Sequence, residues 1–368
     1  MRGKPFVAIL SGLIGLAWGP VSTAQGAPAK PGSAPATPIP TPFVIQTPEQ
    51  ADPIMGDYEG TLTFDTGQSW KAKAGIVPEG SGAYRAVLTV DRPSQTGEPV
   101  EAELRGQLQG GELPLAGLFG DAEVAGRVAG GKLTAEAKGA RPGKFEMSHV
   151  VRHSPTEGQK PPEGAIVLLP FQENTPPAMD EWTNETWVAL PDGSMLVGKG
   201  DNLTRKEFGS YNLHVEFCIP YMPTERGQKR GNSGVYMHNR YEVQVLDSYG
   251  LPPKDNECGG IYKVATPKVK ACFPPLSWQT YDIAFRAPKL SESGELTRPP
   301  VITVAHNGQT IHENVTIPAP TQGGKPDHVE RGPLKLQDHR NPARYRNIWL
   351  VELPGEAPAP PAPAASQP

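Results

Sequence analysis

Residues 231–248 read Gly-Asn-Ser-Gly-Val-Tyr-Met-His-Asn-Arg-Tyr-Glu-Val-Gln-Val-Leu-Asp-Ser. The triplet at 232–234 predicts a turn, residues 235–238 a strand, Asn239-Arg240 a tight connection, and residues 241–247 the returning strand. This stretch therefore indicates two successive strands of a β-sheet.

The returning strand has two different faces, because successive side chains of a strand point to opposite sides. Glu242 and Gln244 share one face, whereas the core face carries Tyr241, Val243 and Val245. A carboxylate that can move protons beside an amide that can fix hydroxyl groups suits a sugar site. An ordinary solvated strand face is the alternative. Asp247 has the opposite parity from Glu242, so both reach one pocket only if the strand ends or bulges before Asp247, which could equally cap the next turn.

The rest of the second half of the chain is also β-rich. Alternation is clear from Leu213 to Ile219, and Asn307-Gly308 is a strong hairpin signal between two apolar-rich arms. No amphipathic pattern of ten or more helical residues stands out, and the 368 residues include 43 Pro and 41 Gly, which disfavour helix interiors. We therefore expect an all-β sandwich of the jelly-roll type, preceded by a small antiparallel β-module.

A second polar cluster occupies residues 332–341, Gly-Pro-Leu-Lys-Leu-Gln-Asp-His-Arg-Asn. Lys335, Gln337 and His339 point away from the side on which the two leucines lie. A histidine at a strand end beside Asp338 can act as a proton shuttle near neutral pH or as a metal ligand. An Asp-His pair that only bonds a loop is the alternative.

A substrate face is expected where these polar segments meet. It would lie between the strand ending at Asp247, the glycine-rich loop 259–263 and the segment 337–339. Tyr236 and Tyr262, in polar segments bordered by glycine, are the aromatic side chains most suited to stack on a sugar ring. The predicted substrate-binding residues are Gln244, Asn232, Tyr236, Tyr262, Lys263, Gln337 and Asp338.

The chain begins with the pattern of an export signal. Arg2 and Lys4 precede an apolar run at residues 6–18, and Ser22-Thr23-Ala24 offers small residues for cleavage. A short uncleaved anchor is the alternative. No later segment approaches the roughly 20 apolar residues of a spanning helix. We expect an exported, periplasmic or extracellular protein with no transmembrane span in its mature chain.

Export changes how the three cysteines are interpreted. Cys258 and Cys272 flank a loop-rich stretch and are the expected disulfide, while Cys218 is expected to be a buried thiol. Zinc is the weaker interpretation of the cysteines, because no CxxC or HxxxH spacing accompanies them, and no Asp-rich loop has calcium-binding spacing. We therefore assign no metal and no cofactor, with calcium as the lesser alternative.

Composition and breaks in pattern divide the chain. The expected parts are a signal peptide at 1–24, a Pro/Ala-rich linker at 25–52, a β-rich accessory domain at 53–153, a jelly roll at 164–353, and a tail at 354–368. The net charge is −4, from 35 basic and 39 acidic residues, and the basic residues are scattered. These numbers disfavour a nucleic-acid partner, and the sequence identifies no partner protein.

Six blocks of the second half resemble the 3-keto-disaccharide hydrolase domain family, formerly a domain of unknown function with a concanavalin-like jelly roll. The resemblance covers about residues 164–353. It rests on residues 206–217, 231–236, 241–248, 258–262 and 278–282, and on Leu336-Gln337-Asp338-His339 followed by Arg346-Asn347-Ile348-Trp349.

The resemblance implies a carbohydrate whose C3 hydroxyl has been oxidised to a ketone. Such a ketone acidifies the C2 proton, so a base can remove it while the C1 substituent leaves. The chemistry needs a base, a donor to the C3 oxygen and an acid for the leaving group. Glu242, His339 and Gln244 are together the candidates for these tasks, and Asp247 is a further catalytic candidate. Direct hydrolysis with Glu242 as the acid is the second mechanism. A non-catalytic carbohydrate-binding or extracellular matrix module is the alternative function.

Overall fold

The computed structural model describes residues 45–91 and 100–354. Its described residues are almost entirely strands, turns and loops. The helical segments among them are α1 (Pro48–Ala51) and a single 3₁₀ turn at Gly227–Lys229. The predicted all-β fold class is confirmed. The expected signal peptide, and most of the expected linker and tail, lie outside the described residues.

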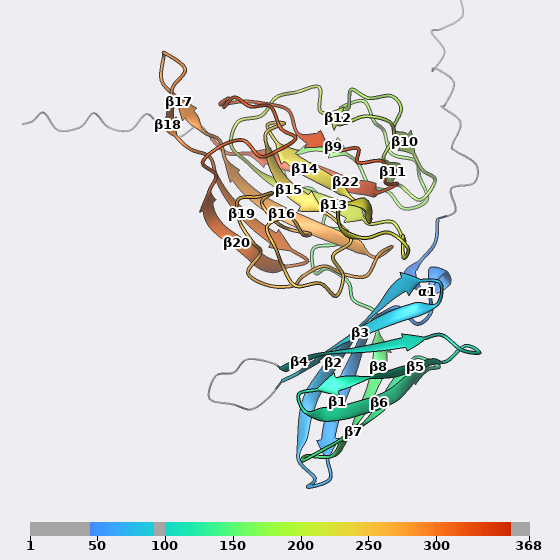
Figure 1. Cartoon of the computed structure of the whole chain (residues 1–368). Coiled ribbons are helices and arrows are strands. Elements are labelled where there is room, and N and C mark those ends of the chain that lie inside the picture. The colour runs from blue at the N-terminus through green and yellow to red at the C-terminus, as the bar shows by residue number, and fades with distance from the viewer. Residues whose placement is uncertain (1–44, 92–99, 355–368) are drawn as a thin grey trace, which may run out of the picture. The chain divides into compact units, whose positions relative to one another are not determined.

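The first β unit is a closed barrel of eight antiparallel strands (Figure 1). The strands are β1 (Gly56–Phe64), β2 (Ser69–Gly80), β3 (Ala83–Val90), β4 (Val100–Gln107), β5 (Leu113–Phe119), β6 (Ala122–Ala129), β7 (Lys132–Lys138) and β8 (Gly143–Val150). Each strand pairs with the next along the chain, and β1 also pairs with β8. Closure leaves no free sheet edge.

Alternating side chains fill the barrel. Tyr84, Ala86, Leu88 and Val90 of β3 are all buried, as the sequence alternation predicts. The barrel interior forms a hydrophobic cluster of its own, drawn from residues between 54 and 147.

The second β unit is a sandwich built around two sheets. The larger sheet has the order β10-β11-β22-β13-β16-β19-β20, with β9 also paired to β22. Its strands are β9 (Ile166–Leu169), β10 (Val188–Ala189), β11 (Met195–Leu196), β13 (Tyr211–Cys218), β16 (Trp278–Arg286), β19 (Val301–His306), β20 (Gln309–Thr316) and β22 (Arg344–Glu352). A separate two-stranded ribbon joins β17 (Lys289–Leu290) and β18 (Leu296–Arg298).

The smaller sheet has four strands in the order β12-β21-β14-β15. They are β12 (Asn202–Leu203), β21 (Lys335–Leu336), β14 (Ser233–Met237) and β15 (Tyr241–Val245). Apolar side chains from both sheets form the second hydrophobic cluster, which includes Phe217 of β13 and Val243 of β15. The order brings β21, almost one hundred residues away in sequence, beside β14. Periodicity alone could not show this pairing.

Two of the three expected turns are confirmed. The turn expected at 232–234 is wrong, because Ser233 and Gly234 are the first residues of β14. Asn307 and Gly308 connect β19 and β20 with φ of 49° and 75°, the conformation that favours Asn-Gly in a tight hairpin. His238 and Asn239 both have positive φ in the turn between β14 and β15. The strand of the expected returning segment ends at Val245, before Asp247.

Strand β13 is buried on both faces, although its alternation predicts a half-buried strand. His214 and Glu216, on the face opposite Leu213 and Val215, are both completely buried. The cause is the segment at residues 154–159, which lies across that face. The amide of Gly158 donates a hydrogen bond to Glu216.

The predicted Cys258–Cys272 disulfide is not formed in this structure, and all three cysteines, each within the described residues, are free thiols. The Cys258 sulfur lies 3.3 Å from the Tyr281 hydroxyl, and the Cys272 thiol faces the carbonyls of Leu246 and Phe273. The predicted burial of Cys218 is confirmed.

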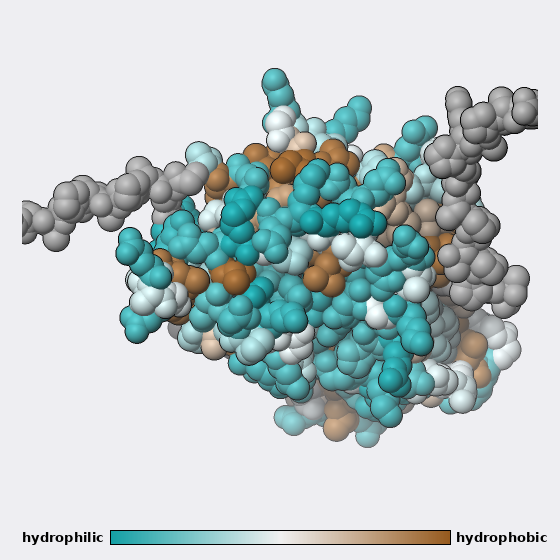
Figure 2. All heavy atoms as spheres, turned by 90° about the horizontal axis from the view of Figure 1, so that it is seen from above, coloured by the Kyte–Doolittle hydropathy of each residue, from teal (hydrophilic) through white to brown (hydrophobic). Residues whose placement is uncertain are grey.

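The described residues contain no helix with the length and apolar character needed to cross a membrane. Figure 2 shows one face of the molecule, on which hydrophobic residues form small groups between hydrophilic side chains. Such scattered exposure is ordinary for a protein surface.

Candidate functional site

A row of polar side chains crosses the smaller sheet on the face turned away from the hydrophobic core. Glu242 on β15 is opposite Tyr236 on β14, and Tyr236 is opposite Lys335 on β21. Cross-strand partners point to the same side of a sheet, so the three side chains are neighbours. Asp201, just before β12, completes the row because its carboxylate lies 3.1 Å from the Lys335 ammonium.

Glu242 is the most strongly perturbed acid in this row. Its residue is only 2 % exposed, and burial raises the pKa of its carboxyl group to about 8. A hydrogen bond from Tyr236 and the charge of Lys335 act in the opposite direction, whereas Asp201 raises the pKa further. A carboxyl group with a pKa near neutrality can both take and return a proton at physiological pH.

Gly234 makes room for the Glu242 carboxylate. A Cβ atom at this position would lie 2.4 Å from Oε1 of Glu242 and 2.8 Å from the ring of Tyr236. Any side chain there would push the carboxylate out of the row. The glycine is therefore a spatial requirement of the site.

Tyr236 links the two charged ends of the row. Its hydroxyl accepts a hydrogen bond of 3.0 Å from Gln337, and its ring lies 3.8 Å beneath the Lys335 ammonium. Both burial and the neighbouring Glu242 carboxylate raise the pKa of the Tyr236 phenol far above its usual value, so the phenol stays protonated. Its single proton lies between the Glu242 carboxylate and the Gln322 carbonyl, which is 3.4 Å away.

The loop at residues 321–324 covers the row. The Thr321 hydroxyl accepts a hydrogen bond from the backbone amide of Glu242, and the carbonyls of Gln322 and Gly323 accept from Tyr236 and Lys335. This cover explains why side chains on the outer face of a sheet are buried.

Three amide side chains around the row each have a buried carbonyl oxygen with no hydrogen-bond partner. Gln244, Asn232 and Gln337 donate through their nitrogen atoms, to Gln228 in the first two cases and to Tyr236 in the third. Their carbonyl oxygens accept nothing. A buried acceptor without a partner costs about 1–3 kcal/mol, so these oxygens are suited to bind hydroxyl groups of a ligand.

Asp247 lies outside the row. Its carboxylate is 2.6 Å from Nε of Arg230 in a buried ion pair and also accepts from the amide of Tyr249. Burial raises the pKa of Asp247, while Arg230 opposes the rise. The structure thus places this predicted catalytic residue in a structural ion pair, and its catalytic role stays a prediction.

Asp338 and His339 line a separate hollow of about 820 Å³, together with Lys229, Asn341 and others. The Asp338 carboxylate accepts from the amides of Gly200 and Arg340, and its own amide donates to Asp201. His339 is exposed. Asp338 therefore connects the hollow to the row through Asp201, and the role of His339 stays a prediction.

Tyr262 and Lys263 lie at the edge of the Glu242 strand. The amide of Tyr262 donates to the Glu242 carbonyl, and the Tyr262 ring is half-buried. Lys263 is exposed, with its ammonium 3.5 Å from Asp255 and 5.8 Å from the Tyr262 ring. Tyr262 is placed to border a ligand, while the lysine faces solvent.

Sequence reasoning missed Lys335 and Asp201. The alternation in residues 334–339 placed Lys335 on the same side as Gln337, which was a usable signal. The contact with Tyr236 and Glu242 depends on strand order, however, which the pattern does not contain. Asp201 lies in a turn-rich stretch, where no sequence pattern marks it as a site residue.

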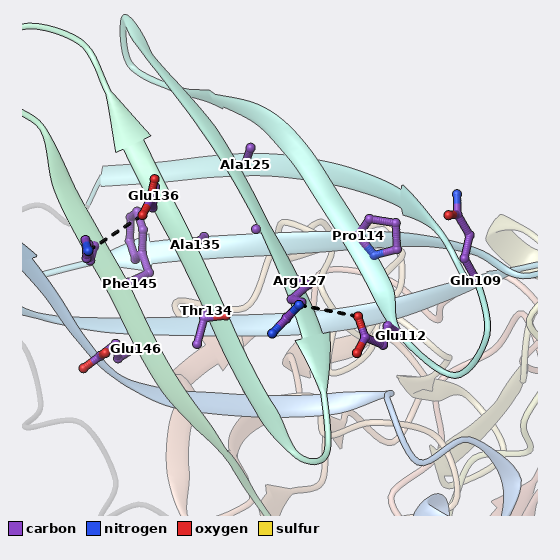
Figure 3. A pocket seen from close by; sticks show the side chains of 12 residues that line it. Gln109, Glu112, Pro114, Ala125, Arg127, Thr134, Ala135, Glu136, Phe145 and Glu146 are labelled. Atoms are coloured by element: carbon purple, nitrogen blue, oxygen red, sulfur yellow. Dashed lines mark ion pairs between the residues drawn. The ribbon is translucent and has the colours of Figure 1, made fainter.

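A hollow of about 470 Å³ on the barrel wall is the other open space of note (Figure 3). Its charged side chains pair with one another, Arg127 with Glu112 and Lys144 with Glu136, at 3.8 Å in each case. All four are exposed, whereas Glu242 is buried. The described residues of either unit contain no cluster of His, Cys, Asp and Glu side chains arranged to hold a metal ion.

Two solved structures are similar to part of this chain. One is a crystal structure of a candidate glycosyl hydrolase from Parabacteroides distasonis, whose sequence is 34 % identical to this chain over the matched region. The match covers 52 % of this chain and 84 % of that protein's chain, with a TM-score of 0.47. A second candidate glycosyl hydrolase from the same organism is 17 % identical, with coverages of 48 % and 90 % and a TM-score of 0.35. No curated protein matches the chain.

The family comparison covers the whole region that supplies the row. Residues 174–351 match the model of the 3-keto-α-glucoside-1,2-lyase-like domain, and this range contains Glu242, Tyr236, Lys335 and Asp201. The sequence resemblance is thereby confirmed. The jelly-roll part of this chain belongs to the 3-keto-α-glucoside-1,2-lyase-like family.

Proposed function

We propose that this protein is a carbohydrate-active enzyme that cleaves the glycosidic bond of 3-keto glycosides or 3-keto-disaccharides. The observation that carries the proposal is the Glu242 carboxyl group, buried with a pKa of about 8 in a row with Tyr236 and Lys335. The description of the family, a lyase-like domain for 3-keto-α-glucosides, supports the same substrate class.

The chemistry follows from the ketone. Glu242, as a carboxylate, removes the C2 proton, and the electron pair of that C–H bond delocalises onto the C3 oxygen. The C1–O bond then breaks, a C1=C2 double bond forms, and the leaving oxygen takes up a proton. A base whose pKa lies near the working pH suits this step, because it is a strong acceptor that is still partly ionised.

The amide side chains bind the sugar. The free carbonyl oxygens of Gln244, Asn232 and Gln337 are suited to accept hydrogen bonds from hydroxyl groups. His339, in the adjoining hollow, is our candidate for the acid that protonates the leaving group.

Elimination fits the row better than a two-carboxylate hydrolysis. Such a hydrolysis needs a second carboxylate free to act as nucleophile or base. Asp247 is held by Arg230, and Asp201 is held by Lys335 and the amide of Asp338. Glu242 is thus left as the acid or base of the row.

The test is a substrate panel with the purified protein. It is incubated with 3-keto-trehalose, 3-keto-glucosides and the unoxidised parent sugars, and the products are followed by NMR. We expect cleavage of the oxidised substrates alone, with an unsaturated C1=C2 product if elimination occurs. If the folded protein binds these sugars but cleaves none, the enzyme proposal fails and the carbohydrate-binding alternative stands.

We also propose that the protein acts after export. The basic start, the apolar run at residues 6–18 and the small residues before position 25 support this location. N-terminal sequencing of the protein recovered outside the cytoplasm should give a chain starting near residue 25. An intact Met1 on all of the protein would contradict the proposal.

A further inference from the structure

Lys335 is a buried lysine in the middle of the candidate site. The residue is 2 % exposed, and lysine is rarely buried unless it is paired. Its ammonium has three neighbours: the Asp201 carboxylate at 3.1 Å, the Gly323 carbonyl at 2.8 Å, and the Tyr236 ring at 3.8 Å. Its position on the outer face of the sheet shows that the ammonium is aimed at the site and not at the core.

One acceptor of the Lys335 ammonium is the carbonyl oxygen of Gly323, in the loop that covers the row. Gly323 is exposed, has a φ of 86°, and lies so close to Tyr236 that a Cβ atom would come within 2.7 Å of the phenol oxygen. The loop therefore places a carbonyl oxygen directly over the row, within hydrogen-bond distance of the Lys335 ammonium. A ketone oxygen of a ligand is the same kind of acceptor as the Gly323 carbonyl, so it can accept the hydrogen bond of the Lys335 ammonium in its place.

We propose that Lys335 is a further catalytic residue, beside Glu242 and the candidate acid His339: its ammonium donates a hydrogen bond to the C3 ketone oxygen of the substrate, which replaces the Gly323 carbonyl as the acceptor. This inference rests on the proposed function. When the C2 proton moves to Glu242, the C–H electron pair shifts to form a C2=C3 enolate with its negative charge on the C3 oxygen. The Lys335 ammonium stabilises that charge, and the electron pair returns as the C1–O bond breaks.

The surroundings of Lys335 fit this task. A fixed cation opposite the atom that gains negative charge is an effective form of transition-state stabilisation. Asp201 fixes the ammonium, and its second carboxylate oxygen is itself held by the amide of Asp338. Tyr236 separates the cation from Glu242, so the base and the cation act on different atoms of one ring, C2 and the C3 oxygen.

The test removes the charge and measures catalysis and binding separately. K335M and K335Q are compared with the wild type, and K206M is the control because Lys206 is paired with Glu181 on the surface of the same domain. We expect kcat for the 3-keto substrate to fall by about 10²-fold in K335M and K335Q. It should be unchanged in K206M.

Binding is measured in the E242Q background, so that the substrate is not consumed. The E242Q protein should bind the 3-keto sugar at least about 10-fold more tightly than the unoxidised parent, the preference expected of a charged hydrogen bond. Adding K335M or K335Q should abolish this preference while leaving the affinity for the parent within about threefold.

The outcomes separate this inference from the proposed function. If the wild type cleaves no 3-keto substrate, the proposed function fails and the role of Lys335 fails with it. If the wild type is active and either folded variant keeps its kcat, only the Lys335 proposal fails. Equal loss of affinity for both sugars would assign Lys335 a purely structural role. Equal affinity of E242Q for ketone and parent contradicts the proposal even if neither Lys335 variant folds.

Discussion

Glu242 lowers the free energy of unfolding of the protein at neutral pH. Its pKa is raised by burial to about 8, whereas in the unfolded chain it is near the ordinary value of 4.5. At pH 7 the folded protein must keep a proton on this carboxyl group that the unfolded chain releases. The buried carboxyl group therefore weakens the folded state at neutral pH.

E242Q should therefore stabilise the fold at neutral and alkaline pH. A raised carboxyl pKa leaves stability intact below about pH 4.5 and reduces it as the pH rises towards 8. We expect E242Q to be more stable than the wild type by about 3 kcal/mol at pH 8 and similar to it at pH 4.5. Urea denaturation at both pH values measures the difference, with E207Q as the exposed control. A less stable E242Q at pH 8 would contradict the assigned environment.

Gly234 provides a steric test of the same carboxylate. In G234A the new methyl group would collide with Oε1 of Glu242, so we expect kcat/KM to fall by about 10²-fold, the effect of a small misplacement of a reacting group. The matched control is G209A in the same domain, whose Cβ would meet the flexible side chain of Arg331 at 3.2 Å and the Glu330 carbonyl at an ordinary contact distance of 3.9 Å. Kinetics on both folded variants checks the prediction, and equal activities would refute it.

At the scale of the element, strand parity could be predicted from the sequence and strand order could not. Alternation in β3 and β15 correctly placed the core side chains, and it put Glu242 and Gln244 on the opposite face. The neighbourhood of Tyr236 and Lys335 depends on β21 pairing with β14 across almost one hundred residues. No local pattern contains that information, so Lys335 escaped the sequence-based site.

The burial of the outer face of β13 is a second feature that the sequence alternation did not predict. Its outer face carries a buried cluster in which His214 contacts Asp282 at 2.7 Å and Glu216 contacts Arg346 at 2.6 Å. Burial alone would lower the pKa of His214, but Asp282 and Glu216 raise it. Burial would raise the pKa of Glu216, but His214, Arg346 and Asn347 lower it.

E216Q should destabilise the sandwich, because it removes the fully buried one of the two carboxylates that pair with Arg346 and leaves only Glu157. We expect a loss of about 3 kcal/mol at pH 7. A lowered carboxyl pKa contributes stability above pH 4.5 and loses it as the pH falls through the folded value, so wild type and variant should converge in acid. Urea denaturation is the measurement, with E181Q in the exposed Lys206 pair as control. A loss no larger than that of E181Q would argue against the cluster.

At the scale of the whole molecule, the candidate site belongs to the sandwich. Glu242, Tyr236, Lys335, Asp201 and the loop at 321–324 all come from residues after the barrel. The barrel contributes none of the residues of the row. The sequence allowed this division to be anticipated, because the polar clusters all fell in the second half.

A protein consisting of residues 154–354 should therefore keep its kcat/KM within about threefold of the full chain, since it retains both the row and the segment that covers β13. A version starting at residue 164 lacks the contacts of Thr156 and Gly158 with β16 and β13, and should unfold at lower urea. Activity and urea midpoints of the two shortened proteins test the division. A folded but inactive 154–354 protein would show that the barrel supplies part of the site.

The most direct test of Glu242 as the catalytic base is the pH dependence of kcat/KM for a 3-keto glycoside, measured in the wild type and in E242Q. If Glu242 is the base, the wild-type value rises with pH and levels off near pH 8, because only the ionised carboxylate accepts the C2 proton. In E242Q the value should be lower by about 10²–10⁴-fold and should lack this rise. An E242Q protein that keeps the wild-type rate and the wild-type profile would contradict the central claim that this carboxyl group performs the proton transfer.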